Sequence, residues 1–391
     1  LYLVIQQKFT QRMHDKRILL STPHMGGEEI NQIKNAFDSN WIAPVGPHIK
    51  NFESELSKIH HKKHVAALQS GTSAIHIALN LLGVSESDIV LCQSFTFVGS
   101  VNPIKYLNAT PVFIDTEIQT WNICPEALET AIKKYIKTGK KPKAIIVVNL
   151  YGMPCKISDI LQLSKKFNIP IIEDAAESLG SKIENTFCGS FGDFGVLSFN
   201  GNKIITTSGG GAIISSNQRL IEKAKFLATQ AKENCDHYEH REMGFNYRIS
   251  NISAAIGVGQ LKVLDKWIKL RRDNYNFYFS LLSSIDGISF QEEPNSFFSN
   301  RWLTTILIDE SKFKNINSNI LRKKLEFNNI ESRPLWKPMH LQPLYKDCDF
   351  IGSNVSDKIY KKGLCLPSGS NLSKKEKERI ENVLSDFFNL K

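Results

Sequence analysis

The stretch Gly195-Val-Leu-Ser-Phe-Asn-Gly-Asn-Lys203-Ile-Ile-Thr-Thr-Ser-Gly-Gly-Gly-Ala212 decides how this sequence is interpreted. A short apolar run typical of a buried strand leads into polar and glycine-rich turns, and one lysine, Lys203, lies between them. Upstream, the apolar run Ile171-Ile-Glu-Asp174 ends in carboxylates. The two segments are about 30 residues apart, which is one strand–turn–strand step in an α/β domain.

This pairing of an amine with a carboxylate matches the needs of one cofactor. A lysine that forms a Schiff base and a carboxylate that pairs with a pyridinium nitrogen are what pyridoxal phosphate (PLP) chemistry requires of a protein. Each residue also has a plain alternative, because most lysines are surface residues and Asp174 is placed to cap a helix. The prediction therefore depends on the motifs around Lys203 and Asp174.

The composition is that of an ordinary soluble globular protein. Hydrophobic residues make up 41% of the 391 residues, and no apolar run approaches the ~20 residues that span a bilayer. The seven cysteines form no Cys-x-x-Cys pair, which argues against a metal site and favours a reducing cytoplasm. The net charge of +10 is spread over mixed-charge helices, so we expect an anionic small substrate and neither a nucleic-acid nor a membrane partner.

Apolar runs alternate with helical patterns along most of the chain. The expected strands cover residues 64–68, 89–91, 111–114, 144–148 and 170–172. The expected helices between them cover residues 72–82, 125–137 and 157–167. This alternation predicts an α/β protein with a mostly parallel sheet covered on both faces. Near the C-terminus, Ser373 and Glu376 predict a capping box at the start of the last helix.

The pattern changes after Ser250, where a long helical stretch begins. We predict a large cofactor-binding domain over residues 18–265 and a smaller α+β domain over residues 266–391. Residues 1–17 are predicted to be an extension. Those before Met13 are expected to add little to the fold, which peptide mapping of the native protein would test.

Further motifs suit a flat cofactor that carries a phosphate. Ser70-Gly71-Thr72-Ser73 follows a strand and opens a helix, where N–H groups and hydroxyls form an anion site; a plain helix cap is the alternative. Phe97 follows the next strand, at the edge where open α/β sheets bind ligands, and is either a stacking residue or a core aromatic. Ser198 follows the strand before the lysine. Glu177 either reaches the same ligand or is solvated.

Two later loops combine cations with amide or aromatic side chains. Gly244-Phe-Asn246-Tyr-Arg248 precedes the long helical stretch, where Arg248 is suited to bind phosphate and Asn246 to donate hydrogen bonds. Arg333-Pro-Leu-Trp336-Lys-Pro-Met-His340 is stiffened by prolines, and it is either a substrate loop or an ordinary surface turn. No single motif decides the function, but their order along the chain does.

In that order, the motifs resemble those of the DegT/DnrJ/EryC1/StrS family of sugar-nucleotide aminotransferases. These are PLP enzymes with the aspartate aminotransferase-like fold (fold type I) and with active sites shared across a homodimer. The resemblance runs from near Ile18 to the C-terminus. The motifs that carry it are residues 70–73, 172–177, 198–203, 209–211, 244–248 and 333–336.

The family implies roles around the cofactor ring. Lys203 forms the Schiff base, Asp174 binds the pyridine nitrogen, Glu177 lies near the ring hydroxyl and Phe97 stacks on the ring. The chain departs from many relatives in having Glu177 in place of Gln or His. It also has the run Ser-Gly-Gly-Gly over residues 208–211 in place of Gly-Glu-Gly-Gly.

The family also implies how the phosphate is held. Gly71, Thr72 and Ser198 bind it within one subunit. Asn246 or Arg248 reaches it from the other subunit, and the spacing leaves open which of the two does so.

Four segments, together with both departures, resemble the branch of the family that serves bacillosamine-type glycosylation. They are residues 20–27, 40–46, 200–211 and 333–340. That branch aminates C4 of UDP-2-acetamido-2,6-dideoxy-α-D-xylo-hexos-4-ulose, with L-glutamate as the amino donor (class EC 2.6.1, specifically 2.6.1.34). Trp336 and His340 are then expected to face the sugar nucleotide.

Other readings stay open on sequence alone. The same chemistry can act on a GDP- or dTDP-linked 4-keto-6-deoxy hexose, as in perosamine synthesis. A PLP-dependent sugar dehydratase is a second alternative, although relatives of that kind carry His in place of the lysine, and Lys203 argues against it. A protein that uses the fold only for binding is a third.

Overall fold

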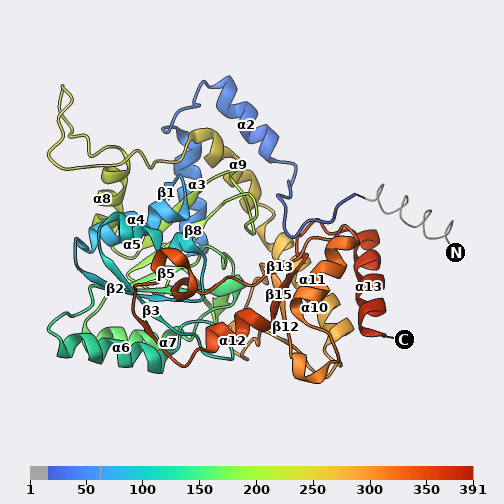
Figure 1. The fold of residues 1–391 in the computed structure, drawn as a ribbon. Helices are drawn as coiled ribbons and strands as arrows, with labels where there is room; N and C mark the ends of the chain where they lie inside the picture. The colour runs from blue at the N-terminus through green and yellow to red at the C-terminus, as the bar shows by residue number, and fades with distance from the viewer. Residues whose placement is uncertain (1–15, 62, 391) are drawn as a thin grey trace.

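The computed structural model describes residues 16–61 and 63–390. The predictions for residues 1–12 therefore lie outside the described residues. None of the helices within the described ranges is long and apolar enough to cross a membrane. Figure 1 shows a large sheet covered by helices beside a smaller unit of helices and strands.

The large sheet has eight strands in the order β1-β9-β8-β5-β4-β2-β3-β14. Their bounds are β1 His64–Leu68, β2 Ile89–Gln93, β3 Thr110–Ile114, β4 Ala144–Val148, β5 Ile171–Asp174, β8 Phe194–Ser198, β9 Gly211–Ser215 and β14 Phe350–Ile351. The pairs from β8 through β14 are parallel, whereas β9 runs antiparallel to both β8 and β1. The predicted mostly parallel sheet is confirmed. The sequence analysis expected turns at the glycine run, whereas the structure begins the antiparallel strand β9 there, at Gly211.

Helices cover both faces of this sheet because its strands are apolar on both sides. One face packs against α4 (Gly71–Leu81), α5 (Asn102–Tyr106) and α8 (Gln218–Ala228). The opposite face packs against α6 (Pro125–Lys137) and α7 (Ile157–Phe167), which lie together below the sheet in Figure 1. A third cluster joins α3 (Pro47–Ile59) and α9 (Asn251–Leu261), and α2 (Glu29–Asp38) packs on α9.

The C-terminal part of the chain is built on an antiparallel sheet with the order β10-β12-β15-β13. Its strands are β10 Ile288–Phe290, β12 Thr304–Ile308, β13 Arg333–Pro334 and β15 Gly363–Leu366. Its helices are α10 Leu264–Leu282, α11 Ser318–Phe327, α12 Val355–Lys362 and α13 Lys374–Phe388. The predicted capping box of α13 is present, since Ser373 and Glu376 bond each other's backbone N–H groups.

Two chain segments cross between these parts. Ile18 is buried in the C-terminal cluster and pairs with Ile330, while β14 adds a strand to the large sheet beside β3. A small sheet of β6 (Lys182–Ile183), β7 (Thr186–Phe187) and β11 (Phe297–Phe298) also joins segments distant in sequence. The domain boundary at 265/266 stays a prediction.

Candidate active site

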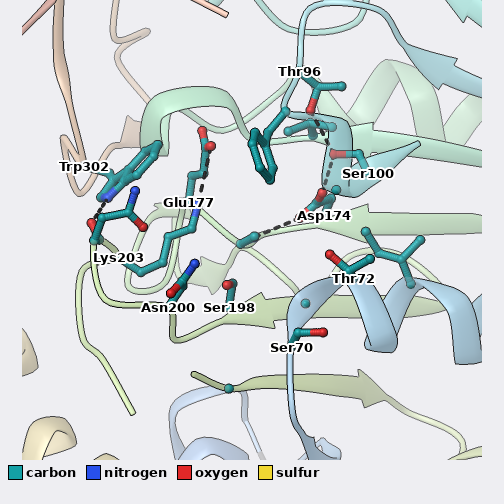
Figure 2. Close-up of a pocket in the computed structure, with 18 of the residues that line it drawn as sticks. Ser70, Thr72, Thr96, Ser100, Asp174, Glu177, Ser198, Asn200, Lys203 and Trp302 are labelled. Carbon is teal, nitrogen blue, oxygen red and sulfur yellow. Dashed lines mark hydrogen bonds and ion pairs between the residues drawn. The ribbon is translucent and has the colours of Figure 1, made fainter. Parts of the chain in front are cut away.

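A cavity of about 270 Å³ opens where β5 and β8 end and α4 begins. Eight of the eleven predicted site residues line it: Gly71, Thr72, Phe97, Asp174, Glu177, Ser198, Lys203 and Trp336. The motifs that lie far apart in the sequence thus meet at the carboxyl edge of the parallel strands, where open α/β sheets bind ligands. Figure 2 shows Lys203 and Asp174 on opposite sides of this cavity.

The first turn of α4 forms one end of the cavity. Ser70 caps the helix by accepting from the Ser73 N–H at 3.0 Å, and the first helical bond runs from the Ala74 N–H to the Ser70 carbonyl. The N–H groups of Gly71 and Thr72 precede that bond and lack an acceptor within the helix. They are available to an anion at the positive end of the helix dipole, so both sequence interpretations of this motif, cap and anion site, fit the geometry.

Asp174 at the end of β5 also lines the cavity and is 5% exposed. Its Oδ2 accepts from the Ser100 hydroxyl at 2.6 Å, and its Oδ1 accepts from the Ala176 N–H at 3.1 Å. Burial raises the pKa of Asp174, although Ser100, Ala176 and the charge of Lys203 oppose this. Both donors are neutral, so a cationic N–H group would complement this carboxylate.

Lys203 extends from the loop after β8 into the cavity, and its side chain is 11% exposed. Its Nζ lies 3.5 Å from Glu177 Oε1 and 4.1 Å from the centroid of the Trp302 ring. Trp302 is fixed by its own indole N–H, which donates to the Asn202 carbonyl at 2.7 Å. Burial raises the pKa of Glu177, and the positive charge of Lys203 opposes that rise. The amine is therefore held between a carboxylate and an aromatic face.

Two further aromatic residues, Phe97 and Trp336, line the cavity. Phe97 is 49% exposed, and its ring centroid lies 5.2 Å from that of Trp336 at an angle of 49°. Trp336 also lines a second cavity of about 450 Å³, together with Arg333 and Lys337. Both cavities share Asn202, Trp302 and Trp336 in their walls. The space for a ligand therefore continues from the lysine toward the 333–337 loop.

Three predicted residues line neither cavity. Asn246 is exposed, whereas the Arg248 guanidinium donates to Glu53 at 2.6 Å and to the Ala67 carbonyl at 2.8 Å within the same subunit. Nδ1 of His340 lies 2.7 Å from the Ser94 hydroxyl. These three residues are therefore placed around the site rather than in its wall.

Other side chains also contact the His340 ring. Nε2 lies 2.9 Å from Asp357, and the ring stacks on Phe350 with centroids 3.8 Å apart. Burial lowers the pKa of His340. The imidazole thus contacts the body of the protein on both nitrogens.

Sequence reasoning missed three residues of the site. Ser100 holds Asp174, Trp302 faces Lys203, and Tyr151 donates its N–H to Glu177 Oε2 at 2.7 Å. Ser100 follows the same strand as Phe97, and a position after a strand of the parallel sheet is a signal that could have identified it as a site residue. Tyr151 follows the predicted strand 144–148, so the same kind of position was available for it, whereas Trp302 comes from a distant segment and carried no local signal.

The donors of this site fit PLP. The free N–H groups of α4 suit a phosphate, the neutral surroundings of Asp174 suit a protonated pyridine nitrogen, and Lys203 supplies the amine. Gly211 lets β9 lie close to the turn at Ser70 and Gly71, because a Cβ at this position would lie 2.3 Å from the Ser70 carbonyl carbon. The structure thus brings Lys203 and Asp174 into one cavity, and their roles toward the cofactor stay predictions.

Comparison with known proteins agrees with this geometry. The sequence profile of the DegT/DnrJ/EryC1/StrS aminotransferase family matches residues 23–385. The chain belongs to this family. Among its relatives is EpsN of Bacillus subtilis (strain 168), provisionally named as a pyridoxal phosphate-dependent aminotransferase. The two are 49% identical over 380 residues, which cover 96% of this chain and 97% of EpsN.

More distant relatives carry names that specify a sugar. GDP-perosamine synthase of Escherichia coli O157:H7 is 33% identical, over 95% of this chain and 99% of that protein. UDP-4-amino-4,6-dideoxy-N-acetyl-beta-L-altrosamine transaminase of Campylobacter jejuni (strain NCTC 11168) is 30% identical, over 87% of this chain and 89% of that protein. Relatives of this family member thus include enzymes named for GDP- and for UDP-linked sugars.

Solved structures of family members share the fold. A DegT DnrJ EryC1 StrS aminotransferase from Brucella abortus has a TM-score of 0.86 at 29% identity, covering 92% of this chain and 95% of that one. The PLP form of Spr1654 from Streptococcus pneumoniae, provisionally named as a sugar aminotransferase, has a TM-score of 0.86 at 25% identity. It covers 96% of this chain and 99% of that one. The predicted fold type is confirmed, and PLP is the cofactor of this aminotransferase.

Proposed function

We propose that this aminotransferase moves an amino group from L-glutamate to C4 of a nucleotide-linked 4-keto-6-deoxy sugar. The preferred acceptor is UDP-2-acetamido-2,6-dideoxy-α-D-xylo-hexos-4-ulose, which gives a UDP-linked 4-amino-4,6-dideoxy sugar and 2-oxoglutarate. The observation that carries the reaction type is the position of the Lys203 amine in a cavity that also presents Asp174 and the free N–H groups of α4.

Each residue has a defined task in this reaction. PLP, when bound, supplies the electron sink that lets an amino group pass between two carbon skeletons. Lys203 takes and returns the proton at the reacting carbon, and Glu177 and Trp302 keep its ammonium in place between transfers. Asp174 holds a proton on the ring nitrogen. The first turn of α4 and Ser198 anchor the phosphate.

The second cavity supports a nucleotide as part of the substrate. Its wall holds two cations, Arg333 and Lys337, and the indoles of Trp302 and Trp336. It also holds Glu331, which pairs with Arg333 at 2.7 Å and leaves Lys337 as the cation not bound to that carboxylate. A diphosphate and a base are the chemical groups that such side chains bind. Three of the four segments that resemble the bacillosamine-type branch, residues 20–27, 200–211 and 333–340, contribute to this wall. Their convergence favours the UDP-linked acceptor over a GDP-linked one.

We also propose a homodimer in which Asn246 completes the partner's phosphate site. Glu53 and Ala67 occupy the Arg248 guanidinium inside its own subunit, while Asn246 is exposed two residues before it. This arrangement supports Asn246, rather than Arg248, as the residue that reaches the partner's phosphate.

A product assay tests the proposed reaction. Holoenzyme, L-glutamate and one of three acceptors, the UDP-, GDP- or dTDP-linked 4-keto-6-deoxy sugar, are incubated and analysed by mass spectrometry. We expect a 4-amino product with the UDP-linked 2-acetamido sugar at a kcat/KM at least about tenfold above the other two. A preference for the GDP-linked sugar would refute the proposed substrate. A deoxygenated product without nitrogen would refute aminotransfer.

A further inference from the structure

Tyr151 is buried beside the cavity in an unusual backbone conformation. It follows β4, is 1% exposed, and has φ 57° and ψ 18°, the left-handed region that a bulky side chain seldom adopts. Such a conformation persists where the surroundings fix it, and it is found most often at functional sites. Here it directs the Tyr151 N–H to Oε2 of Glu177, whose other oxygen lies 3.5 Å from Lys203.

The side chain of Tyr151 reaches in another direction. Its hydroxyl oxygen accepts from the backbone N–H of Trp336 at 2.8 Å, and the two rings lie nearly parallel, at 16° with centroids 6.4 Å apart. Trp336 lines both cavities. One residue therefore contacts the carboxylate beside the lysine and also the loop at the mouth of the substrate space.

The loop that carries Trp336 follows β13, which pairs with β15, and it is held at two further points. At one end, the Met339 N–H donates to the Ser94 carbonyl at 2.8 Å, and His340 is bonded to the Ser94 hydroxyl. At the other end, the contact is the Tyr151 hydroxyl. Loss of that hydroxyl would remove the hydrogen bond at Trp336 while β13 and the His340 end stay attached, so the indole between them would sample more positions.

We propose that Tyr151 is a positioning residue for the sugar substrate, acting through Trp336. Its backbone N–H independently orients Glu177. The role in substrate affinity rests on the proposed function, whereas the contact with Trp336 does not. The two contacts are separable, because Tyr151→Phe removes the hydroxyl and keeps the N–H.

The test compares Tyr151→Phe with Tyr278→Phe, a buried tyrosine on α10 whose hydroxyl donates to the Pro367 carbonyl at 2.8 Å. For Tyr151→Phe we expect the KM for the sugar nucleotide, and the Kd of the cofactor-free protein for UDP-N-acetylglucosamine by calorimetry, to rise about fivefold. The absorbance of the bound cofactor and its bleaching by glutamate should stay within about twofold, because the N–H to Glu177 remains. Tyr278→Phe should leave the KM and the Kd unchanged.

A measurement without substrate separates this inference from the proposed function. The fluorescence of Trp336, taken as the difference between proteins with and without Trp336→Phe, should be quenched more strongly by acrylamide in the Tyr151→Phe background. Unchanged quenching, or an equal change in Tyr278→Phe, would overturn the positioning role. Altered quenching in a protein that turns over none of the three sugars would leave the positioning of Trp336 standing and refute the proposed substrate.

Discussion

Three carboxyl groups are buried within five consecutive residues at the end of β5. Glu173 is satisfied away from the cavity by Asn149 and by the Phe191 N–H, whereas Asp174 and Glu177 face the cavity. Burial raises the pKa of all three groups. A pKa that is higher in the folded protein than in the unfolded chain means that folding takes up protons. The contribution of these three groups to the stability of the cofactor-free protein therefore falls as the pH rises from about 4 through their folded pKa values.

Asp174→Asn removes one of these buried charges. We expect the substitution to stabilise the cofactor-free protein by about 1 kcal/mol at pH 8, because an amide is less costly to bury than a carboxylate, and to have little effect at pH 4. The same change should weaken PLP binding and nearly abolish aminotransfer, because the ring nitrogen loses its anionic partner. Urea unfolding of the cofactor-free protein at both pH values measures the first effect. A destabilised variant at pH 8 would contradict it.

At this scale the sequence predicted what the cofactor demands and missed what positions those groups. Lys203 and Asp174 each follow a strand, and the order of the motifs around them favours PLP chemistry over the plain alternative that each residue has. Trp302 lies about 100 residues beyond Lys203, in a segment that reads as an ordinary strand start, and only tertiary packing places its ring over the amine. His340 was expected to face the sugar, whereas the structure places its ring against Ser94, Asp357 and Phe350.

At the scale of elements, apolar runs located strands and helices well. The helices expected at 125–137 and 157–167 have those bounds in the structure, because their apolar faces and flanking residues are unambiguous. The long helical stretch after Ser250 is instead two helices, α9 and α10, that break at Lys262 and Val263. The apolar pattern continues across the break, so periodicity could not reveal it.

The glycine run shows how an element positions the site. At Gly211, a Cβ would lie 2.4 Å from the Gly71 nitrogen, whereas nothing lies within 4 Å of a Cβ at Gly209. We therefore expect Gly211→Ala to displace the first turn of α4, with a loss of about 2 kcal/mol or more in stability and a marked loss of PLP affinity. Gly209→Ala should be nearly neutral. Thermal unfolding and PLP titration of both variants measure this difference, and equal behaviour would contradict the role of Gly211.

At the scale of the whole molecule, large apolar side chains are exposed on and around α2. They are Met25, Ile30, Phe37, Trp41, Ile42 and Val45, with exposed fractions between 45% and 71%. A surface of this kind is typical of an interface. Since α2 packs on α9, which follows Arg248 in the chain, this surface supports the proposal that a second copy of the chain completes the site.

Mixing two inactive variants tests the shared site. Lys203→Ala and Asn246→Ala subunits, unfolded together and refolded, should form heterodimers in which one site keeps both native residues. Random pairing makes about half of the dimers heterodimers with one intact site of two, so about one quarter of the wild-type activity should return. Lys203→Ala mixed with Asp174→Asn is the control, since both residues belong to one subunit's cavity and no intact site can form. Equal activity in the two mixtures would refute the shared site.

The most direct test of the account is to locate the lysine that bonds to PLP. The holoenzyme is reduced with borohydride, digested and sequenced by mass spectrometry, with Lys203→Ala and the exposed Lys269→Ala treated in parallel. We predict the phosphopyridoxyl mass on the peptide that contains Lys203, its retention in Lys269→Ala, and its loss, together with aminotransfer, in Lys203→Ala. The mass on any other lysine, or none in a protein that still transfers amino groups, would contradict the central claim.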